Sequence, residues 1–224
     1  MGQLNPSGAI FLSAGVPNPS AKHFVSEGDS AAISAAVSAL LYVVLGRRQL
    51  VWGGHPAITP MVWAFATSME VDYGAWVKLY QSAFFQDEFP EETAHFKNVV
   101  VTPKVAESLP ESLLLMRQKM LDESNYAAAV FLGGMQGIFE EFELFKERSP
   151  SAAILPVMTT GGAAAKLGEQ IDAEVGLASE YDYIALFHRL LEIDPNERRY
   201  ASPAVQPANV ADRILRPTAS PPSD

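Results

Sequence analysis

Short runs of consecutive apolar residues recur along the chain, separated by longer segments with a helical pattern. Most of the runs are apolar on adjacent positions rather than on every second position, which is typical of strands covered on both faces. We expect strands at Ala9–Ser13, Gln49–Trp52, Trp76–Tyr80, Asn98–Thr102, Ala127–Leu132 and Ala153–Met158. This pattern predicts a sheet that is mainly parallel.

Helix-start signals and apolar spacings of three and four residues mark the segments between these runs. Asp29 or Ser30 is expected to cap one helix, and Thr59-Pro60 looks like a cap followed by proline at the first helical position. We expect helices over residues 30–45, 59–69, 107–123, 137–148, 163–173 and 180–193. Strands that alternate with helices predict an α/β fold of the Rossmann-like type, in three layers with helices on both faces of the sheet.

The composition changes near residue 194. Residues 195–224 are rich in Pro, Ser and Ala, so we expect an extended or partly disordered C-terminal tail there. Residues 1–194 then form one Rossmann-like domain, which a chain of 224 residues can accommodate.

The overall composition narrows the classes of partner. Hydrophobic residues make up 48% of the chain, which favours a folded core over disorder. The net charge of −10, without a basic cluster, argues against nucleic acid as a partner. Without cysteine there is no thiolate site, and the four histidines lack ligand-like spacing, so we expect no metal. No signal peptide is evident and the longest apolar stretch, residues 31–45, is too short to cross a bilayer. We therefore expect a cytoplasmic protein with no membrane partner.

Three glycine pairs directly follow or come soon after predicted strands, and each precedes a predicted helix: Gly53-Gly54, Gly133-Gly134 and Gly161-Gly162. The carboxyl ends of parallel strands lie at one edge of a sheet, where ligands bind. The helix that follows such a turn offers free N–H groups to phosphate or carboxylate. Glycine also fits such turns for steric reasons alone, but three turns in register favour a ligand site. None of them is a complete P-loop or dinucleotide-binding fingerprint.

Other candidates lie beside these turns. His55 directly follows Gly53-Gly54 in the same turn, where a structural histidine is at least as common as a catalytic one. Gln81 and Ser82 follow the third predicted strand. The predicted ligand-binding residues are Ser13, Gly15, Gly53, Gly54, His55, Gln81, Ser82, Gly133, Gly134, Met135, Gly137, Thr160, Gly161 and Gly162.

The stretch MRQKMLDESNYAAAVFLGGMQGIFEEFELF resembles the nucleotide-binding core of the lysine-decarboxylase-like, or SLOG, superfamily, whose best-known enzymes are the cytokinin-activating phosphoribohydrolases. Arg117 precedes Gly133 by 133 − 117 = 16 positions, the spacing that this family uses. An ungapped alignment places Glu140 on the family's catalytic glutamate, whereas a shift of one residue places Glu141 there. The chain departs from the motif at Gln118, where the family has lysine, and at Gln136-Gly137, where it has Gly-Thr.

The resemblance implies that Arg117 orients a phosphate or ribose and that Glu140 or Glu141 holds a ribose hydroxyl. In an N-glycosidase that glutamate would also stabilise a cationic ribosyl transition state. We expect a sensor or binding domain for a nucleotide or nucleotide-sugar ligand, such as a nucleoside phosphate or an NAD-derived signal. The alternative is a phosphoribohydrolase-like enzyme that cleaves the N-glycosidic bond of a nucleotide. A third class is a partner-binding protein whose turns are only steric. We expect no cofactor, and the resemblance implies a homodimer or a larger homo-oligomer.

Overall fold

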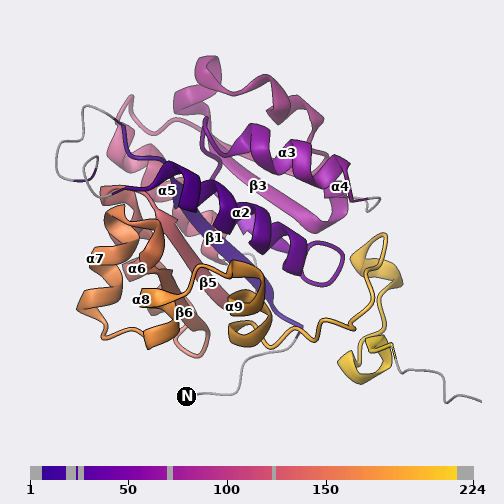
Figure 1. Ribbon diagram of the computed structural model, residues 1–224. Helices are drawn as coiled ribbons and strands as arrows, with labels where there is room; N and C mark the ends of the chain where they lie inside the picture. The colour runs from indigo at the N-terminus through magenta and orange to yellow at the C-terminus, as the bar shows by residue number, and fades with distance from the viewer. Residues whose placement is uncertain (1–6, 19–23, 25–27, 70–72, 123–124, 216–224) are drawn as a thin grey trace, which may run out of the picture.

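The computed structural model describes residues 7–18, 24, 28–69, 73–122 and 125–215. At its centre lies a six-stranded, fully parallel sheet with the strand order β4-β3-β2-β1-β5-β6 (Figure 1). The strands are β1 Ala9–Gly15, β2 Leu50–Trp52, β3 Val77–Ser82, β4 Val99–Thr102, β5 Tyr126–Gly133 and β6 Ala153–Val157. The predicted three-layer α/β Rossmann-like fold is confirmed.

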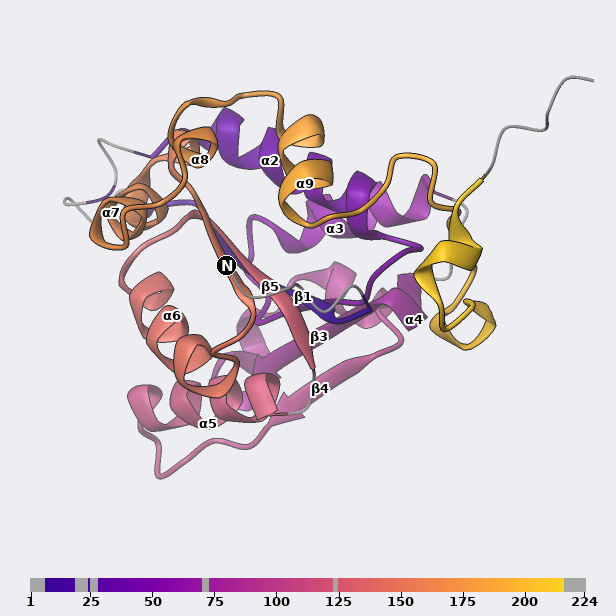
Figure 2. The same cartoon turned by 90° about the horizontal axis from the view of Figure 1, so that it is seen from below.

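Helices cover both faces of this sheet (Figure 2). One layer contains α2, α3, α8 and α9, and the other contains α5, α6 and α7, while α4 leads directly into β3. The helices are α2 Ser30–Val44, α3 Thr59–Thr67, α4 Tyr73–Trp76, α5 Leu109–Asp122, α6 Gln136–Arg148, α7 Gly162–Gln170, α8 Val175–Ser179 and α9 Tyr183–Leu190. Short 3-10 turns are η1 Ala83–Glu88, η2 Glu91–His95, η3 Met158–Thr160, η4 Pro203–Val205 and η5 Val210–Arg213.

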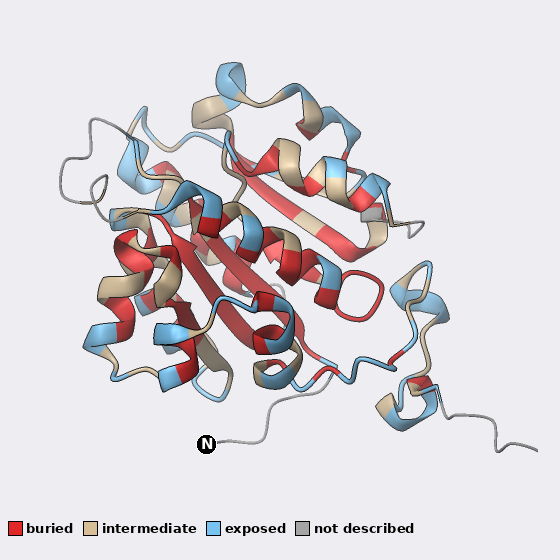
Figure 3. Ribbon diagram, in the orientation of Figure 1, coloured by how far each residue is buried: buried red, intermediate tan, exposed pale blue. Residues whose placement is uncertain are grey.

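Alternate residues of each strand supply two separate apolar cores. Ile10 and Leu12 of β1 face the layer that contains α2, and Phe11 faces α6, where its ring stacks on Phe145 at 5.5 Å. Four strands, β1, β2, β3 and β5, are therefore buried along most of their length, whereas the edge strand β4 is buried only at Thr102. The helices are buried mainly on their inner sides (Figure 3). This double coverage explains why the strands read as continuous apolar runs.

Two predicted helix starts have different outcomes. Asp29 does cap α2, because its carboxylate accepts hydrogen bonds from the N–H groups of Ala31 and Ala32. The prediction that Thr59 caps the next helix was wrong: Thr59 is already helical, and its hydroxyl donates to the carbonyl of His55. The sequence did not predict α4 or α8, each of five residues or fewer, too short to show a periodic pattern.

The direction of chain progression reverses between β1 and β5. From β1 the chain moves outward through β2, β3 and β4, and it then returns to build β5 and β6 on the other side of β1. In open parallel sheets ligands bind in the crevice that forms at this reversal, outside the carboxyl ends of the strands. The turns after β1 and β5 therefore define where a site is expected.

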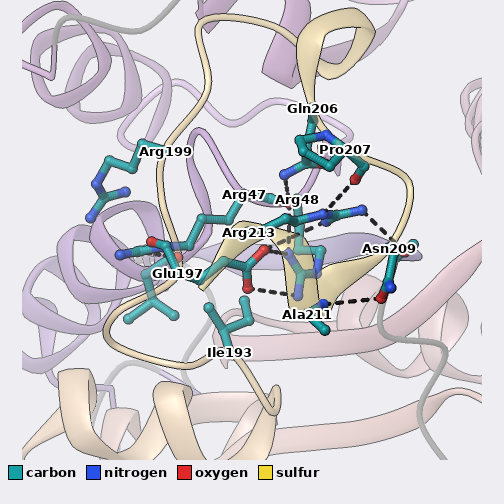
Figure 4. Close-up of polar contacts among 12 residues, drawn as sticks. Arg47, Arg48, Ile193, Glu197, Arg199, Gln206, Pro207, Asn209, Ala211 and Arg213 are labelled. Carbon is teal, nitrogen blue, oxygen red and sulfur yellow. Dashed lines mark hydrogen bonds and ion pairs between the residues drawn. The ribbon is translucent and has the colours of Figure 1, made fainter. Parts of the chain in front are cut away.

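The first part of the Pro-rich C-terminal segment is bound to the opposite end of the sheet. Residues 195–215 lie beside the loop that precedes β2 (Figure 1), and Tyr200 donates its N–H to the carbonyl of Gly46 in that loop. Trp76 donates its indole N–H to the carbonyl of Tyr200 at 2.8 Å. Glu197 is only 2% exposed and pairs with Arg48 through two hydrogen bonds of 2.6 and 3.0 Å (Figure 4). The domain boundary at residue 194 stays a prediction, but residues 195–215 are packed against the rest of the chain.

Two arginines, Arg48 and Arg213, face this buried carboxylate, and two more, Arg47 and Arg199, lie next to them. Arg47 and Arg199 donate mainly to backbone carbonyls, including those of Tyr42 and Val43 in the last turn of α2, which would otherwise lack partners. Cations at a helix C-terminus are also favoured by the helix dipole. Burial lowers the pKa of Arg47 to about 10 and lowers the pKa values of Arg199 and Arg213.

Within the part of the chain that the structure describes, none of the helices combines the length and apolar character that a membrane crossing requires.

Candidate functional site

A cleft of about 300 Å³ opens at the carboxyl edge of the sheet, beside the reversal point. Its walls come from the turns after β1, β2, β3 and β5, and from α5 and α6. It brings together most of the residues that the sequence singled out: Ser13, Gly15, Gly53, Gly54, His55, Gln81, Ser82, Arg117, Gly134, Met135, Gly137 and Glu141. Gly133, Glu140, Thr160, Gly161 and Gly162 do not line it.

Arg117 and the two glutamates form one ion-paired group at the junction of α5 and α6. Arg117 Nε donates to Glu141 Oε1 at 3.2 Å, and Arg117 Nη1 donates to Glu140 Oε2 at 2.5 Å. The Arg117 side chain is 10% exposed, that of Glu141 is 15% exposed and that of Glu140 is 50% exposed. Glu141 thus faces the cleft, whereas Glu140 binds the arginine from the solvent side.

Ser13 completes the environment of Glu141. Its hydroxyl lies at the carboxyl end of β1 and donates to Glu141 Oε2 at 2.5 Å. Each oxygen of the Glu141 carboxylate is therefore fixed by a group from a different element.

The amino end of α6 opens directly onto the cleft. The helix begins at Gln136 after Met135, no side chain caps it, and no acidic residue stands in its first turn. A Cβ atom at Gly137 would lie 3.0 Å from Arg117 Nη2, so a larger residue there would press on the guanidinium. Uncapped N–H groups together with the positive end of the helix dipole favour an anion at this place.

The remaining glycine turns hold the edge of the sheet together. Gly134 donates its N–H to the carbonyl of Gly15 at 2.7 Å, and Gly133 donates to the Thr160 hydroxyl at 2.8 Å. A Cβ atom at Gly162 would lie 2.8 Å from the carbonyl oxygen of Gly134. These contacts fix the turns after β1, β5 and β6 against one another, and a ligand role for Gly133, Thr160, Gly161 and Gly162 stays a prediction.

His55 lines the wall after β2 as a neutral side chain. Its Nδ1 accepts the backbone N–H of Ala57 at 3.2 Å, and burial lowers the pKa of its imidazole below 6.5. An acceptor role for Nδ1 places the proton of the neutral ring on Nε2. A Cβ atom at Gly15 would lie 3.4 Å from that nitrogen, so this glycine leaves room for the ring.

Gln81 and Ser82 belong to the end of β3 rather than to the turn after it. Gln81 is 6% exposed, and within the described structure its Oε1 has no hydrogen-bond partner, while its Nε2 lies 3.5 Å from the Thr93 hydroxyl. Ser82 accepts the N–H of Phe84 and so starts η1. A buried acceptor without a partner is the kind of group that a bound molecule or water satisfies.

An apolar wall of the cleft was not predicted from the sequence. It is formed by Phe85, Phe89 and Pro90, which lie between β3 and β4, and by Leu113 and Met116 of α5. The apolar residues of AFFQDEFP indicate that this segment is partly buried. They do not show which side chains of a 3-10 turn face the cleft.

The charges that line the cleft are sparse. Among the described lining residues Arg117 is the single lysine or arginine, and two carboxylates already bind it, while Glu88 adds a further negative charge. The described residues contain no group of three or more histidine or acidic side chains placed to hold a metal ion.

Comparison with known proteins agrees with this geometry. No curated protein sequence matches the chain. The model of the SLOG cluster3 family matches residues 23–191, which is more than half of the chain and includes Arg117, both glutamates and the three glycine pairs. A parallel sheet that carries these glycine turns at its carboxyl edge, together with this match, shows that the chain belongs to the SLOG cluster3 family.

Proposed function

We propose that the cleft binds a nucleotide or nucleotide-derived ligand and that the protein acts as a sensor or binding domain for it. The observation that carries this proposal is the pairing of an uncapped helix start with a fixed carboxylate in one cleft. Phosphate suits the N–H groups at the start of α6. A ribose suits Glu141, which lies on the same helix.

The free acceptor positions on the Glu141 carboxylate support this placement of the ribose. A carboxylate offers about four acceptor positions, two on each oxygen. Arg117 occupies one on Oε1 and Ser13 occupies one on Oε2. One position then remains on each oxygen, which matches the two adjacent hydroxyl groups of a ribose.

The rest of the cleft suits a base and limits the size of the ligand. The apolar wall of Phe85, Phe89, Pro90, Leu113 and Met116 offers a surface against which a flat nucleobase can pack. A volume of about 300 Å³ is at the lower limit for small-molecule sites. Since the cleft also lacks an unpaired cation among its described residues, a ligand with few phosphates fits better than a triphosphate or an intact dinucleotide.

The binding proposal is tested by thermal unfolding of the full chain with adenosine, AMP, ADP, ATP, ADP-ribose and NAD. A ligand at 100 times its dissociation constant adds about 2.7 kcal/mol of stability, which raises the melting temperature by several degrees. We expect AMP to give the largest shift and 2′-deoxy-AMP to give a smaller one. An Arg117→Ala variant should bind the best ligand about 10- to 100-fold more weakly. A chain that none of these nucleotides stabilises would contradict the proposal.

A second candidate function, hydrolysis of an N-glycosidic bond, is favoured by the orientation of Glu141. A carboxylate held inside the cleft can stabilise positive charge on a ribosyl carbon and activate water. Glu140 is half exposed, so we assign this role to Glu141 and not to its neighbour.

The two adjacent glutamates provide a matched pair of variants. Glu141→Gln should abolish the release of base while leaving ligand binding largely intact, because its charge matters most in the transition state. Glu140→Gln should retain most of the release. Released base is measured by chromatography after incubation with nucleoside monophosphates and NAD. Wild type that binds a nucleotide without releasing base would support the sensor function alone. Equal loss in both variants would contradict the assignment to Glu141.

A further inference from the structure

Ser13 lies near the carboxyl end of β1, two residues before the strand ends at Gly15, and its side chain is directed at the α5–α6 layer. It pairs in register with Phe131 of β5, and the residue two positions before it, Phe11, stacks on Phe145 of α6. Alternate residues of a strand share a face, so Ser13 points toward α6 as well. It is 4% exposed.

The single hydrogen of the Ser13 hydroxyl is used within the protein. A serine hydroxyl donates only one hydrogen bond, and here Glu141 Oε2 receives it at 2.5 Å. Hydrogen bonds from a hydroxyl to a carboxylate are short and stronger than those between neutral groups. Ser13 therefore has no hydrogen left to donate to a ligand in the same cleft.

The bond fixes a carboxylate that would otherwise have one anchor. Arg117 of α5 holds Oε1 of Glu141, and Ser13 of β1 holds Oε2, so the plane of the carboxylate is set from two sides. Glu140 provides the comparison: its side chain is 50% exposed and binds Arg117 from the solvent side.

We infer that Ser13 is a positioning residue, which acts on the ligand through Glu141 and not by direct contact. The inference rests on the proposed function, since it takes Glu141 to be the carboxylate that binds the ligand. Because Ser13 and Arg117 already hold the Glu141 side chain, this side chain loses little conformational entropy when the ligand binds. Ser13 thereby improves affinity without contacting the ligand.

The ligand-free protein gives the first test, a double-mutant cycle of urea unfolding. Ser13→Ala should lower the urea midpoint in wild type and leave it unchanged in a Glu141→Ala background. Ser112→Ala is the matched control, because Ser112 is a buried serine with two hydrogen bonds on α5 and does not line the cleft. It should lower the midpoint equally in both backgrounds. An equal loss from Ser13→Ala in both backgrounds would overturn the inference.

The second test repeats the cycle on affinity for AMP, measured by calorimetry. We expect Glu141→Ala to weaken binding about 10- to 100-fold and Ser13→Ala to weaken it about 2- to 10-fold. The double variant should bind as Glu141→Ala does, because Ser13 would have nothing left to position. Losses that multiply would show that Ser13 contacts the ligand itself and would overturn the inference while the proposed function stands. If no nucleotide binds to wild type, the proposed function fails, and the urea cycle still decides whether Ser13 and Glu141 are coupled.

Discussion

The buried carboxylate of Glu197 makes a quantitative prediction about the C-terminal segment. Glu197→Gln keeps the size of the side chain and removes its charge. In the native protein Glu197 accepts two hydrogen bonds from Arg48 and lies 3.5 Å from Arg213 Nη1. The amide would present N–H donors to one of these arginine nitrogens. It would also leave the guanidinium groups of Arg48 and Arg213 without the negative charge that they face in the native protein.

The magnitude follows from the burial of both partners. The side chains of Glu197 and Arg48 are 0% and 2% exposed, so water cannot replace the lost interaction. Removing one member of a buried ion pair costs about 3–5 kcal/mol. For a chain of this size each kcal/mol corresponds to roughly 2–4 °C, so the melting temperature should fall by roughly 6–20 °C.

The assay is urea and thermal unfolding of the full chain, followed by circular dichroism. Glu180→Gln is the control, because it breaks a pair of similar length with Arg189 on the surface, and it should have a much smaller effect. A chain that ends at residue 194 should also be clearly less stable than the full chain. If Glu197→Gln and the shortened chain both have the urea midpoint and the melting temperature of wild type, residues 195–215 are not part of the cooperative fold and the reasoning is refuted.

Three further predictions concern the site and its supports. Burial lowers the pKa of His55, so on acidification through pH 6.5 the unfolded chain takes up a proton more readily than the folded chain does. The free energy of unfolding should therefore fall as the pH is lowered, and it should fall less steeply in His55→Asn. Urea unfolding at pH 7.5, 6.5 and 5.5 measures this. Gly133→Ala should destabilise by more than about 1 kcal/mol, because φ is +56° and the new Cβ would lie 2.4 Å from Ile33 Cδ1; an unchanged urea midpoint would contradict this. Asp29→Ala should cost about 0.5–2 kcal/mol through the lost cap of α2, and Asp29→Asn, measured alongside it, should lose less.

The expectations of a homo-oligomer and of a cytoplasmic location stay predictions. Light scattering on the purified chain would test the first, and fractionation of cells that produce it would test the second.

The sequence by itself determined the architecture and the edge of the sheet where the site lies. Continuous apolar runs such as that of β5 are local signals of a doubly covered strand, and they predicted all six strands to within two residues at each end. The glycine pairs after these strands are also local signals, since a parallel sheet places every such turn at the same edge. Both conclusions need only neighbouring residues and the general rules of parallel sheets.

Only the tertiary structure decided which side chains meet. Glu140 and Glu141 are adjacent in sequence, yet neighbouring residues of a helix point about 100° apart. The rotation of α6 about its own axis, as it packs against α5, therefore sets which of the two side chains enters the cleft. Ser13 and Glu141 are separated by 128 positions, and Arg48 and Glu197 by 149. Contacts over such separations leave no local pattern, because each residue looks like an ordinary polar position until the sheet and its helices bring the two together.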